Sequence, residues 1–391
     1  VDNIQSIIKL FADDTSMSCS MKNPIIRADT LNSDLRKVYD WARTWKVNFN
    51  AEKTELLTFK RNTLPVYPLS FGSSVLQEKD THKHLGLTIQ NNCKWDQHIN
   101  NIIRTVTLLL SCLRSYKYSL SRKALENMYK SFVLPHFDYA DVIWDNCTEG
   151  NCNRLEKLHL EAIRIILGTV KGTSHELLYS ESGFCPLKER RRRHKLIYFH
   201  KMLNDRVPAS VSNLTPPLVS STNPYHRRRP LERKVPTCKT ELYKKSFVPS
   251  TAALWNDLPE NIQSTTSLSL LKKFLSKDET IVPSYYYYGK RKPQLHHCRL
   301  RLGMSDLKYD LYRRHLIEDP VCACGHPAET SEHFLLHCPL YTNARTPTLG
   351  KLDNELKDIH TLLFGNDNLS LPVNINIFST VQDFVAQSGR F

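Results

Sequence analysis

The first part of the chain alternates short apolar runs with one longer amphipathic stretch. Over residues 4–20, apolar and β-branched residues flank Asp13 and Asp14, which predicts two strands joined by a tight turn at the acids. Apolar residues then recur at helical spacing, at Leu31, Leu35, Val38, Ala42 and Trp45. Two further short segments suit strands, Thr54–Phe59 and His84–Ile89. This order predicts an α+β fold in which one helix packs on a sheet.

After Trp95 the apolar positions take helical spacing. Three stripes predict a small helical domain, Ile99 to Leu113, Leu125 to Phe132, and Leu155 to Ile166. Trp144 and Phe132 are expected to be packing residues. A basic run, Lys188–Lys195, follows, and it suits a solvated face, a nuclear-import signal or a phosphate-binding strip.

A stretch rich in Pro, Ser and Arg, about Val207 to Pro236, favours a largely irregular linker. The cysteines and histidines of the last hundred residues lie beyond it. We therefore expect four regions, of which the third is a basic linker region: 1–95, 96–203, 204–288 and 289–391.

Charge and cysteine usage narrow the class of protein. Lys and Arg number 54 against 39 Asp and Glu, and the net charge of +15 favours a polyanionic partner, nucleic acid more than an anionic membrane surface. The 11 cysteines lack the spacing of a disulfide framework, so we expect an intracellular location, nucleus or cytoplasm, and not secretion. No apolar run approaches the roughly 20 residues that cross a bilayer. Because Val1 is followed closely by an apolar strand, we expect the chain to begin within a domain.

Asp13 and Asp14 form the first candidate site. Adjacent carboxylates repel each other, and they stay ionised together only where water or cations neutralise them. Mg²⁺ is held by one or two carboxylates plus substrate phosphates, and polymerases use a pair of such ions. The simpler interpretation of an isolated Ala-Asp-Asp sequence is a polar turn between strands.

Three motifs in one order change that balance: Phe11–Asp14, Trp45–Phe59 and His82–Ile99. Together they resemble the later part of the polymerase domain of non-LTR (LINE or jockey-type) retrotransposon reverse transcriptases. The similarity continues into the helical segments Tyr129–Trp144 and Leu155–Gly168, and it is weak across about 205–285. The resemblance implies a partial polymerase palm followed by a helical thumb-like region.

The resemblance also implies roles for single residues. Asp13, with Asp14 beside it, would be the catalytic pair and would ligate Mg²⁺. Lys53, in an Asn-x-x-Lys-Thr segment, would lie near the phosphates of the incoming nucleotide, although a solvated lysine before a strand fits the spacing equally. Gly86 falls in a segment that resembles the primer-contacting hairpin, where a glycine lets two backbones approach closely.

A two-metal site needs a third carboxylate from another strand. In the family, that Asp, the fingers and the first half of the palm precede the hairpin, whereas here about ten residues precede it. We therefore expect a fragment of an RNA-directed DNA polymerase, either a piece of a longer polyprotein or a decayed copy, that is inactive as an isolated chain. Whether this chain is itself an enzyme stays open.

The second candidate site lies near the C-terminus, where three cysteines and a histidine have the spacing C-x-C-x8-H-x4-C. Three thiolates and one imidazole suffice for a closed, structural Zn²⁺ site. Scattered reduced cysteines are the alternative, since the usual knuckle is C-x2-C. The segment Arg299–Arg345 resembles the cysteine–histidine region of LINE-type polymerases, which favours zinc. The expected ligands are Cys322, Cys324, His333 and Cys338, with His326 and His337 as less well placed candidates.

Basic residues precede this segment, beside Tyr285–Tyr288 and His296-His297. They offer phosphate contacts and stacking faces for nucleic acid, while the alternative is that they pack the zinc segment against its neighbours. The expected nucleic-acid contacts are Lys290, Arg291, Lys292, Arg299 and Arg301.

The polymerase interpretation implies an RNA template, a DNA target or primer, Mg²⁺ and Zn²⁺, and no membrane. Two other interpretations stay open. A non-catalytic RNA- or DNA-binding protein would use the zinc segment and basic residues alone, and an inert remnant of a decayed element would use neither. An Asp-bearing strand about a hundred residues before Val1 would favour the enzyme. Zinc retention with salt-dependent binding would favour the binding protein over the remnant.

Overall fold

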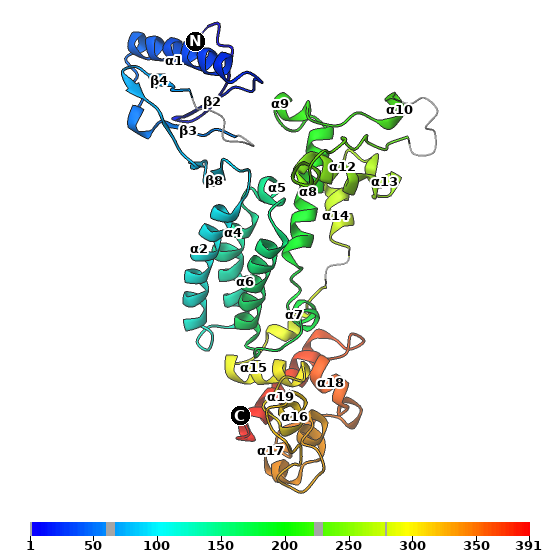
Figure 1. Ribbon diagram of the computed structural model, residues 1–391. Coiled ribbons are helices and arrows are strands. Elements are labelled where there is room, and N and C mark those ends of the chain that lie inside the picture. The colour runs from blue at the N-terminus through cyan, green and yellow to red at the C-terminus, as the bar shows by residue number, and fades with distance from the viewer. Residues whose placement is uncertain (1, 60–66, 223–229, 278–279) are drawn as a thin grey trace. The chain divides into compact units, whose positions relative to one another are not determined.

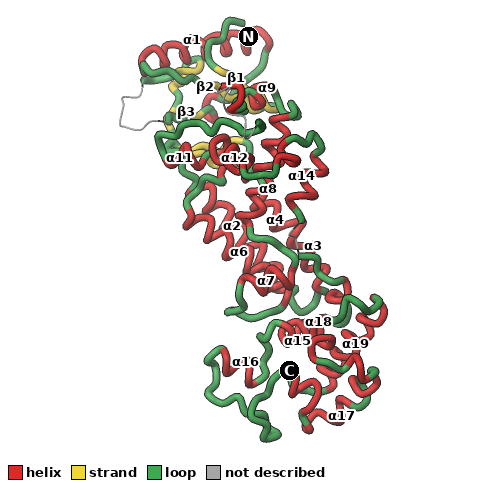
Figure 2. The backbone as a smooth tube through the Cα atoms, turned by 90° about the vertical axis from the view of Figure 1, so that its right-hand side faces the viewer, coloured by secondary structure: helices red, strands yellow, loops and turns green. Residues whose placement is uncertain are grey.

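The computed structural model describes residues 2–59, 67–222, 230–277 and 280–391 (Figure 1). Internal contacts divide the chain into two compact units, Val1–Asn101 and Ile102–Phe391. Every strand of the described residues lies in the first unit, and helices build the second (Figure 2). The expected mixture of helix and strand is therefore confirmed.

The predicted N-terminal hairpin is present in the first unit. Strand β1 (Ile7–Phe11) pairs antiparallel with β2 (Asp14–Ser18), with Phe11 opposite Asp14. Ala12 and Asp13 form the two-residue turn between them. Ala12 has a φ of 51°, in the left-handed region that few residues other than glycine, asparagine and aspartate adopt.

Helix α1 (Pro24–Trp45) begins seven residues before the expected Leu31. The side chain of Asn23 accepts hydrogen bonds from two backbone N–H groups of the first turn, and Pro24 occupies the first helical position, where its missing N–H costs nothing. The helix ends at Lys46, which adopts the left-handed conformation. The apolar core of this unit includes Ala28, Leu35, Val38, Leu69, Phe71 and Leu76.

The other strands are shorter than predicted. The first predicted segment yields only β3 (Glu55–Leu56), and the second is split, because β7 (Thr81–His84) turns at Leu85 and Gly86 into β8 (Leu87–Gln90). We expected a single sheet, and this prediction is wrong for the described residues. Their strands form four separate two-stranded sheets. The remaining strands are β4 (Ser70–Phe71), β5 (Ser74–Val75) and β6 (Gln77–Glu78).

Helices are present at all three predicted stripes, although the second stripe does not hold as far as Phe132. The stripes lie on α2 (Asp96–Ser115), on α3 (Arg122–Met128) and on α6 (Glu149–Leu167). Trp144 is fully buried as expected, but Phe132 is 62% exposed, so the prediction that it packs in the core is wrong. A π-helical turn at Tyr129–Val133 continues α3, and its wider turn brings Val133 to the core in place of Phe132.

The remaining helices of the second unit are mostly short. Those up to residue 275 are α4 (Leu134–Asp138), α5 (Asp141–Trp144), α7 (His175–Ser182), α8 (Leu187–Leu203), α9 (Ala209–Ser212), α10 (Val219–Thr222), α11 (Glu241–Lys245), α12 (Phe247–Asn256), α13 (Glu260–Gln263) and α14 (Leu268–Leu275). Those that follow are α15 (Arg291–Arg301), α16 (Lys308–Arg313), α17 (Thr342–Arg345), α18 (Ile359–Phe364) and α19 (Leu371–Gln387).

The expected linker region, 204–288, contains a folded part. Helices α12 and α14 both pack on α8, and Trp255 and Leu271 are buried there against Phe199. Pro249 lies in the first turn of α12, where proline is tolerated because the first N–H groups have no partner within the helix. Within the predicted irregular stretch, residues 223–229 lie outside the described part of the chain.

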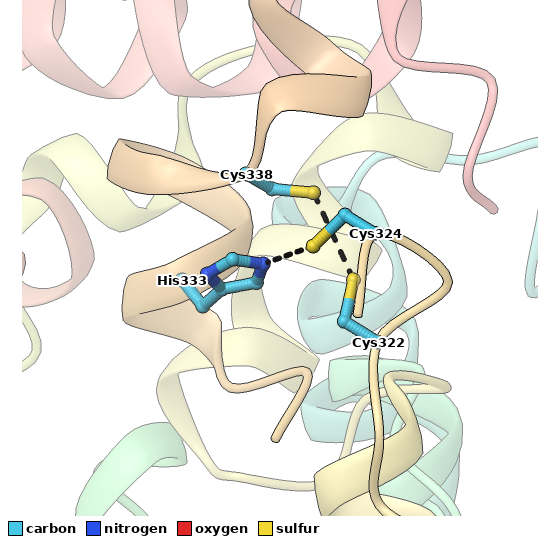
Figure 3. Close-up of side chains that lie close together, drawn as sticks. All are labelled: Cys322, Cys324, His333 and Cys338. Carbon is cyan, nitrogen blue, oxygen red and sulfur yellow. Dashed lines mark hydrogen bonds between the residues drawn. The ribbon is translucent and has the colours of Figure 1, made fainter. Parts of the chain in front are cut away.

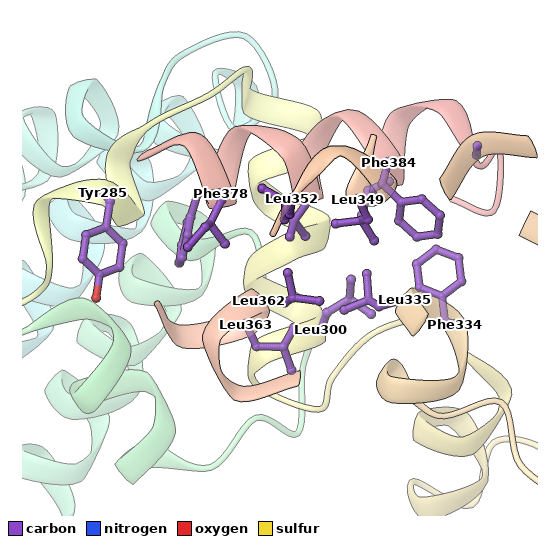
Figure 4. Close-up of a cluster of buried hydrophobic side chains, with 14 of the residues drawn as sticks. Tyr285, Leu300, Phe334, Leu335, Leu349, Leu352, Leu362, Leu363, Phe378 and Phe384 are labelled. Carbon is purple, nitrogen blue, oxygen red and sulfur yellow. The ribbon is translucent and has the colours of Figure 1, made fainter. Parts of the chain in front are cut away.

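The C-terminal part of the second unit has its own apolar core (Figure 4). Phe378 and Phe384 on α19 face Leu362 on α18, Leu300 on α15 and Phe334 near the cysteine segment. These side chains are almost completely buried. Removing this much apolar surface from water is the main stabilising term for the last hundred residues.

One buried carboxylate links this core to the preceding helices. Glu181, at the end of α7, accepts hydrogen bonds from both Nε and Nη2 of Arg301 (2.9 and 2.7 Å) and from Nη1 of Arg122 (2.8 Å). All three side chains are at most 4% exposed. Burial by itself would raise the pKa of Glu181, but the two arginines outweigh it, so that pKa lies below its usual value.

Replacing Glu181 by Gln should lower the free energy of unfolding by about 3–5 kcal/mol, because two buried guanidinium groups lose their counter-charge. Urea unfolding followed by circular dichroism measures this loss. Glu241→Gln, at a highly exposed carboxylate on α11, is the matched control and should cost less than about 0.5 kcal/mol. Equal unfolding midpoints for both variants would contradict a structural role for the ion pair.

The ion pair also predicts a pH dependence. Since the folded-state pKa of Glu181 is lowered, its contribution is present above the unfolded-state pKa of about 4.3 and is lost as the pH falls through the folded-state value. The stability difference between the chain and Glu181→Gln should be full at neutral pH and shrink below about pH 4. If the difference in the free energy of unfolding stayed constant down to about pH 3, lost packing and not lost charge would explain the effect of Glu181→Gln.

Candidate functional site

The two acids of the hairpin lie at its tip. Asp13 is in the turn, Asp14 is the first residue of β2, and both side chains are exposed. In the described residues, neither belongs to a cluster of three or more groups able to hold a metal ion. The hairpin therefore presents two carboxylates to solvent, without a third ligand from the described part of the chain.

Lys53 and Gly86 also lie in turns of the first unit. Lys53 ends a 3₁₀ turn, and its backbone N–H donates to the side chain of Asn50 (3.1 Å), while its own side chain is exposed. Gly86 (φ 81°) follows Leu85 (φ 45°) in the hairpin turn, a pair of positive φ angles that favours glycine. No hydrogen bond or ion pair within the described ranges joins either residue to the two acids.

The cysteine–histidine segment forms one compact cluster (Figure 3). The Sγ atoms of Cys322 and Cys338 are 3.7 Å apart, and Sγ of Cys324 lies 3.2 Å from Nε2 of His333. All four ligand atoms lie within 4.8 Å of one another. Since Zn–S bonds are about 2.3 Å long, two thiolates of a tetrahedral site lie about 3.8 Å apart. The predicted ligands are thus brought together in a geometry that fits zinc.

Local turns set this geometry. Gly325 (φ 91°) follows Cys324, and its N–H donates to the carbonyl of Cys322 (2.9 Å), so both cysteines lie on one tight turn. A π-helical turn, His333–His337, carries the histidine and places Cys338 directly after it. Each pair of ligands is thus held by a local turn, and the four residues that the spacing and the resemblance had indicated lie together.

The protonation of the cluster responds to its surroundings. Burial raises the pKa of Cys338 to about 12, whereas a backbone hydrogen bond from His326 lowers the pKa of Cys324. Burial lowers the pKa of His333, which favours the neutral imidazole that a metal requires. The ring of His326 stacks on that of His333 (centroids 4.0 Å apart) and lies outside the four-ligand set, as does His337.

The support of the cluster could not be predicted from sequence spacing. Arg345 on α17 donates to the carbonyls of Leu335 (2.8 Å), Phe334 (3.1 Å) and Cys338 (2.8 Å). These are main-chain groups of the turn that carries two of the ligands. A guanidinium group with several donors can satisfy three carbonyls at once, and it therefore fixes the turn.

Three of the five basic residues expected to contact nucleic acid are engaged inside the protein. Arg291 and Arg301 are buried; Arg301 pairs with Glu181, and Arg291 donates to main-chain carbonyls. Arg299 donates to the carbonyl of Gly168 (2.9 Å). Their sequence pattern resembled a phosphate-binding strip, but these guanidinium groups do not point to solvent. Of the five, Lys290 and Lys292 are exposed.

The basic run 188–195 belongs to α8, and several of its members pair with carboxylates of residues 138–145. Arg190 uses Nε and Nη2 on Asp138 (2.5 and 2.7 Å), and His194 lies 2.6 Å from Asp141. The remaining pairs join Arg191 and Lys195 to Asp145. Asp138, Asp141 and His194 are close enough to hold a metal, but Arg190 already occupies both oxygens of Asp138. The arrangement favours a structural role.

In the part of the chain that the structure describes, no helix is both long and apolar enough to cross a membrane. No protein-family model and no solved structure matches the chain.

Several curated proteins are similar to it. The RNA-directed DNA polymerase from the mobile element jockey of Drosophila melanogaster is 28% identical over 171 residues, 43% of this chain and 19% of the relative. The Pol polyprotein from the type-1 retrotransposable element R1 of Bradysia coprophila is 21% identical over 351 residues, 86% of this chain and 32% of the relative.

A third relative is the probable RNA-directed DNA polymerase from transposon X-element of D. melanogaster, 20% identical over 54% of this chain. The chain spans about a fifth to a third of the length of these relatives. Over part of its length, the chain is homologous to the RNA-directed DNA polymerases of non-LTR, jockey-type retrotransposons.

Proposed function

We propose that this chain is part of a retrotransposon RNA-directed DNA polymerase and takes part in RNA-templated DNA synthesis. The observation that carries the proposal is the homology to such polymerases, which reaches 86% of the chain in the R1 element. The first unit would supply the later part of the palm, and the second a helical thumb-like part and a zinc-bearing tail.

In this proposal the hairpin tip performs the metal chemistry. Asp13 would hold Mg²⁺ with Asp14 beside it, and the ion would activate the primer hydroxyl and neutralise charge on the nucleotide phosphates. Exposed Lys53 would contact those phosphates, and Gly86 would let the hairpin backbone approach the primer. A third carboxylate must join the two acids for full activity, because two adjacent carboxylates alone give inadequate metal geometry.

The exposed apolar side chains of the hairpin suggest that other polypeptide covers this strand in the working enzyme. Ile7, Leu10 and Phe11 of β1 are each at least 60% exposed. Large apolar side chains gathered on one strand are costly in water, and they usually mark a contact surface. Further polypeptide of the polymerase would cover them.

The Cys/His cluster would bind a structural Zn²⁺ through Cys322, Cys324, His333 and Cys338. Four protein ligands leave no open position for substrate, so the ion would stabilise the tail and take no part in catalysis.

A second candidate function is nucleic-acid binding without catalysis. Two observations favour it: the net charge of +15, and the Cys/His cluster, which belongs to the second unit whereas the hairpin belongs to the first. Primer extension distinguishes the two, because the second candidate predicts binding without synthesis.

Joining this chain to the region of the jockey polymerase that precedes its matched part should give RNA-templated primer extension with Mg²⁺. Asp13→Asn should reduce the extension rate about 100-fold or more, because a metal ligand supplies several kcal/mol of transition-state stabilisation. Asp29→Asn, at an exposed carboxylate on α1, is the control and should leave the rate unchanged. Undiminished extension by the Asp13→Asn chimera would remove Asp13 from the metal site.

The zinc proposal predicts about one Zn²⁺ per purified chain, and none after Cys338→Ser, because the neutral hydroxyl of serine replaces a thiolate in a four-ligand site. Metal content is measured by atomic emission. Cys112→Ser, at an exposed cysteine on α2, is the control and should keep the ion. Unchanged zinc content in Cys338→Ser would refute the assignment.

A further inference from the structure

Two segments far apart in the sequence meet in the second unit. Nε of Arg291, in the first turn of α15, donates to the carbonyl of Lys117 in the loop between α2 and α3 (2.8 Å). Its Nη2 donates to the carbonyls of Ile165 and Ile166 near the end of α6 (3.1 and 2.8 Å). The start of α15 therefore lies against the loop that contains Tyr116–Tyr118.

Cations accumulate at this junction. The ammonium of Lys117 is near the guanidinium groups of Arg291 and Arg299. Burial lowers the pKa of Lys117, and these like charges lower it further, whereas the neighbouring Tyr118 raises it. Lys290 and Lys292 flank Arg291 and are exposed.

Carbonyl groups near the end of α6 accept hydrogen bonds from Arg291 and Arg299. The carboxylate of Asp306 lies 3.3 Å from the guanidinium group of Arg299. No carboxylate in the described ranges pairs with Lys117, Lys290 or Lys292. The lysines therefore leave an uncompensated positive charge, which an anion would neutralise.

Aromatic rings lie beside Lys117. Tyr118 is 64% exposed and Tyr116 is 48% exposed. The ammonium of Lys117 lies 5.3 Å from the centre of the Tyr118 ring. Exposed tyrosine rings next to lysines are the combination that binds single strands, since bases stack on the rings while phosphates contact the cations.

We infer that Tyr116, Lys117, Tyr118, Lys290 and Lys292 form a single-strand-binding surface, here named the lysine–tyrosine surface. The inference rests on the proposed function and names the surface that would hold the single-stranded RNA template. Duplex DNA keeps its base faces stacked and would use only the lysines. An anionic membrane would likewise require no stacking on the rings.

Fluorescence anisotropy with labelled (U)₂₀ RNA at several KCl concentrations tests the inference on the full chain. Tyr118→Ala should weaken binding about tenfold through lost stacking. Lys292→Gln should reduce the slope of log K against log[salt] by about 0.7, the value for one phosphate contact on a single strand. Both side chains are exposed, and unchanged thermal unfolding would show that the variants fold.

Tyr243→Ala on α11 and Lys273→Gln on α14 make the same substitutions at other exposed positions and should bind like the unsubstituted chain. Equal affinities and slopes for all four variants would overturn the surface and leave the polymerase proposal intact. Tighter binding to a 20-base-pair DNA duplex or to phosphatidylserine vesicles than to (U)₂₀, with no effect of Tyr118→Ala, would overturn it in favour of a purely electrostatic contact. The primer-extension and zinc experiments do not depend on these outcomes.

Discussion

The architecture of the second unit depends on the charge of Glu181. A carboxylate removed from water is stable only where cations and hydrogen bonds replace its hydration, and here Arg122 and Arg301 do so from segments far apart in the sequence. Each guanidinium group also lies over a tyrosine ring, Arg122 over Tyr287 and Arg301 over Tyr286. Because neither arginine can be buried unless the carboxylate is in place, α3, α7 and α15 must meet in one arrangement. This ion pair therefore helps to hold residues 102–391 together as one compact unit.

The same arrangement gives the Cys/His cluster a rigid support. Arg301 begins a continuous path of buried groups, because Tyr286 packs on Phe378 and the α19 face extends to Phe384 and then to Phe334, next to His333. Ligands on a flexible loop must be ordered when the metal binds, and this ordering lowers the affinity for the metal. Ligands on packed turns are largely preorganised. The proposed Zn²⁺ would thus add to a core that already exists.

Local features could be predicted from the sequence, and long-range pairing could not. The hairpin at Asp13 and the helical stripes depend on residues close together in the chain, so their spacing predicted them. The four-ligand cluster is local as well, although its spacing left scattered cysteines open and the resemblance to LINE-type polymerases was needed to favour it. The fate of a basic residue depends on partners that spacing does not reveal. Arg291 contacts a carbonyl 174 positions away, and α8 turns its basic run towards Asp138, Asp141 and Asp145. Both the start of α15 and the basic run on α8 resembled nucleic-acid-binding strips. The sequence shows the positive charge of these side chains, but it does not show that many of them are buried or paired.

This division between inside and outside follows from the chemistry of the two basic side chains. Arginine keeps its charge when buried and satisfies several carbonyls or both oxygens of a carboxylate, as Arg345 and Arg190 do. Lysine has a compact, strongly hydrated ammonium group that is stable mainly at the surface. At the start of α15 the two types alternate, so Arg291 fixes the helix to the α2–α3 loop while Lys290 and Lys292 remain in solvent. The excess positive charge available to a nucleic acid is therefore carried there by lysine, and it is held in place by arginine.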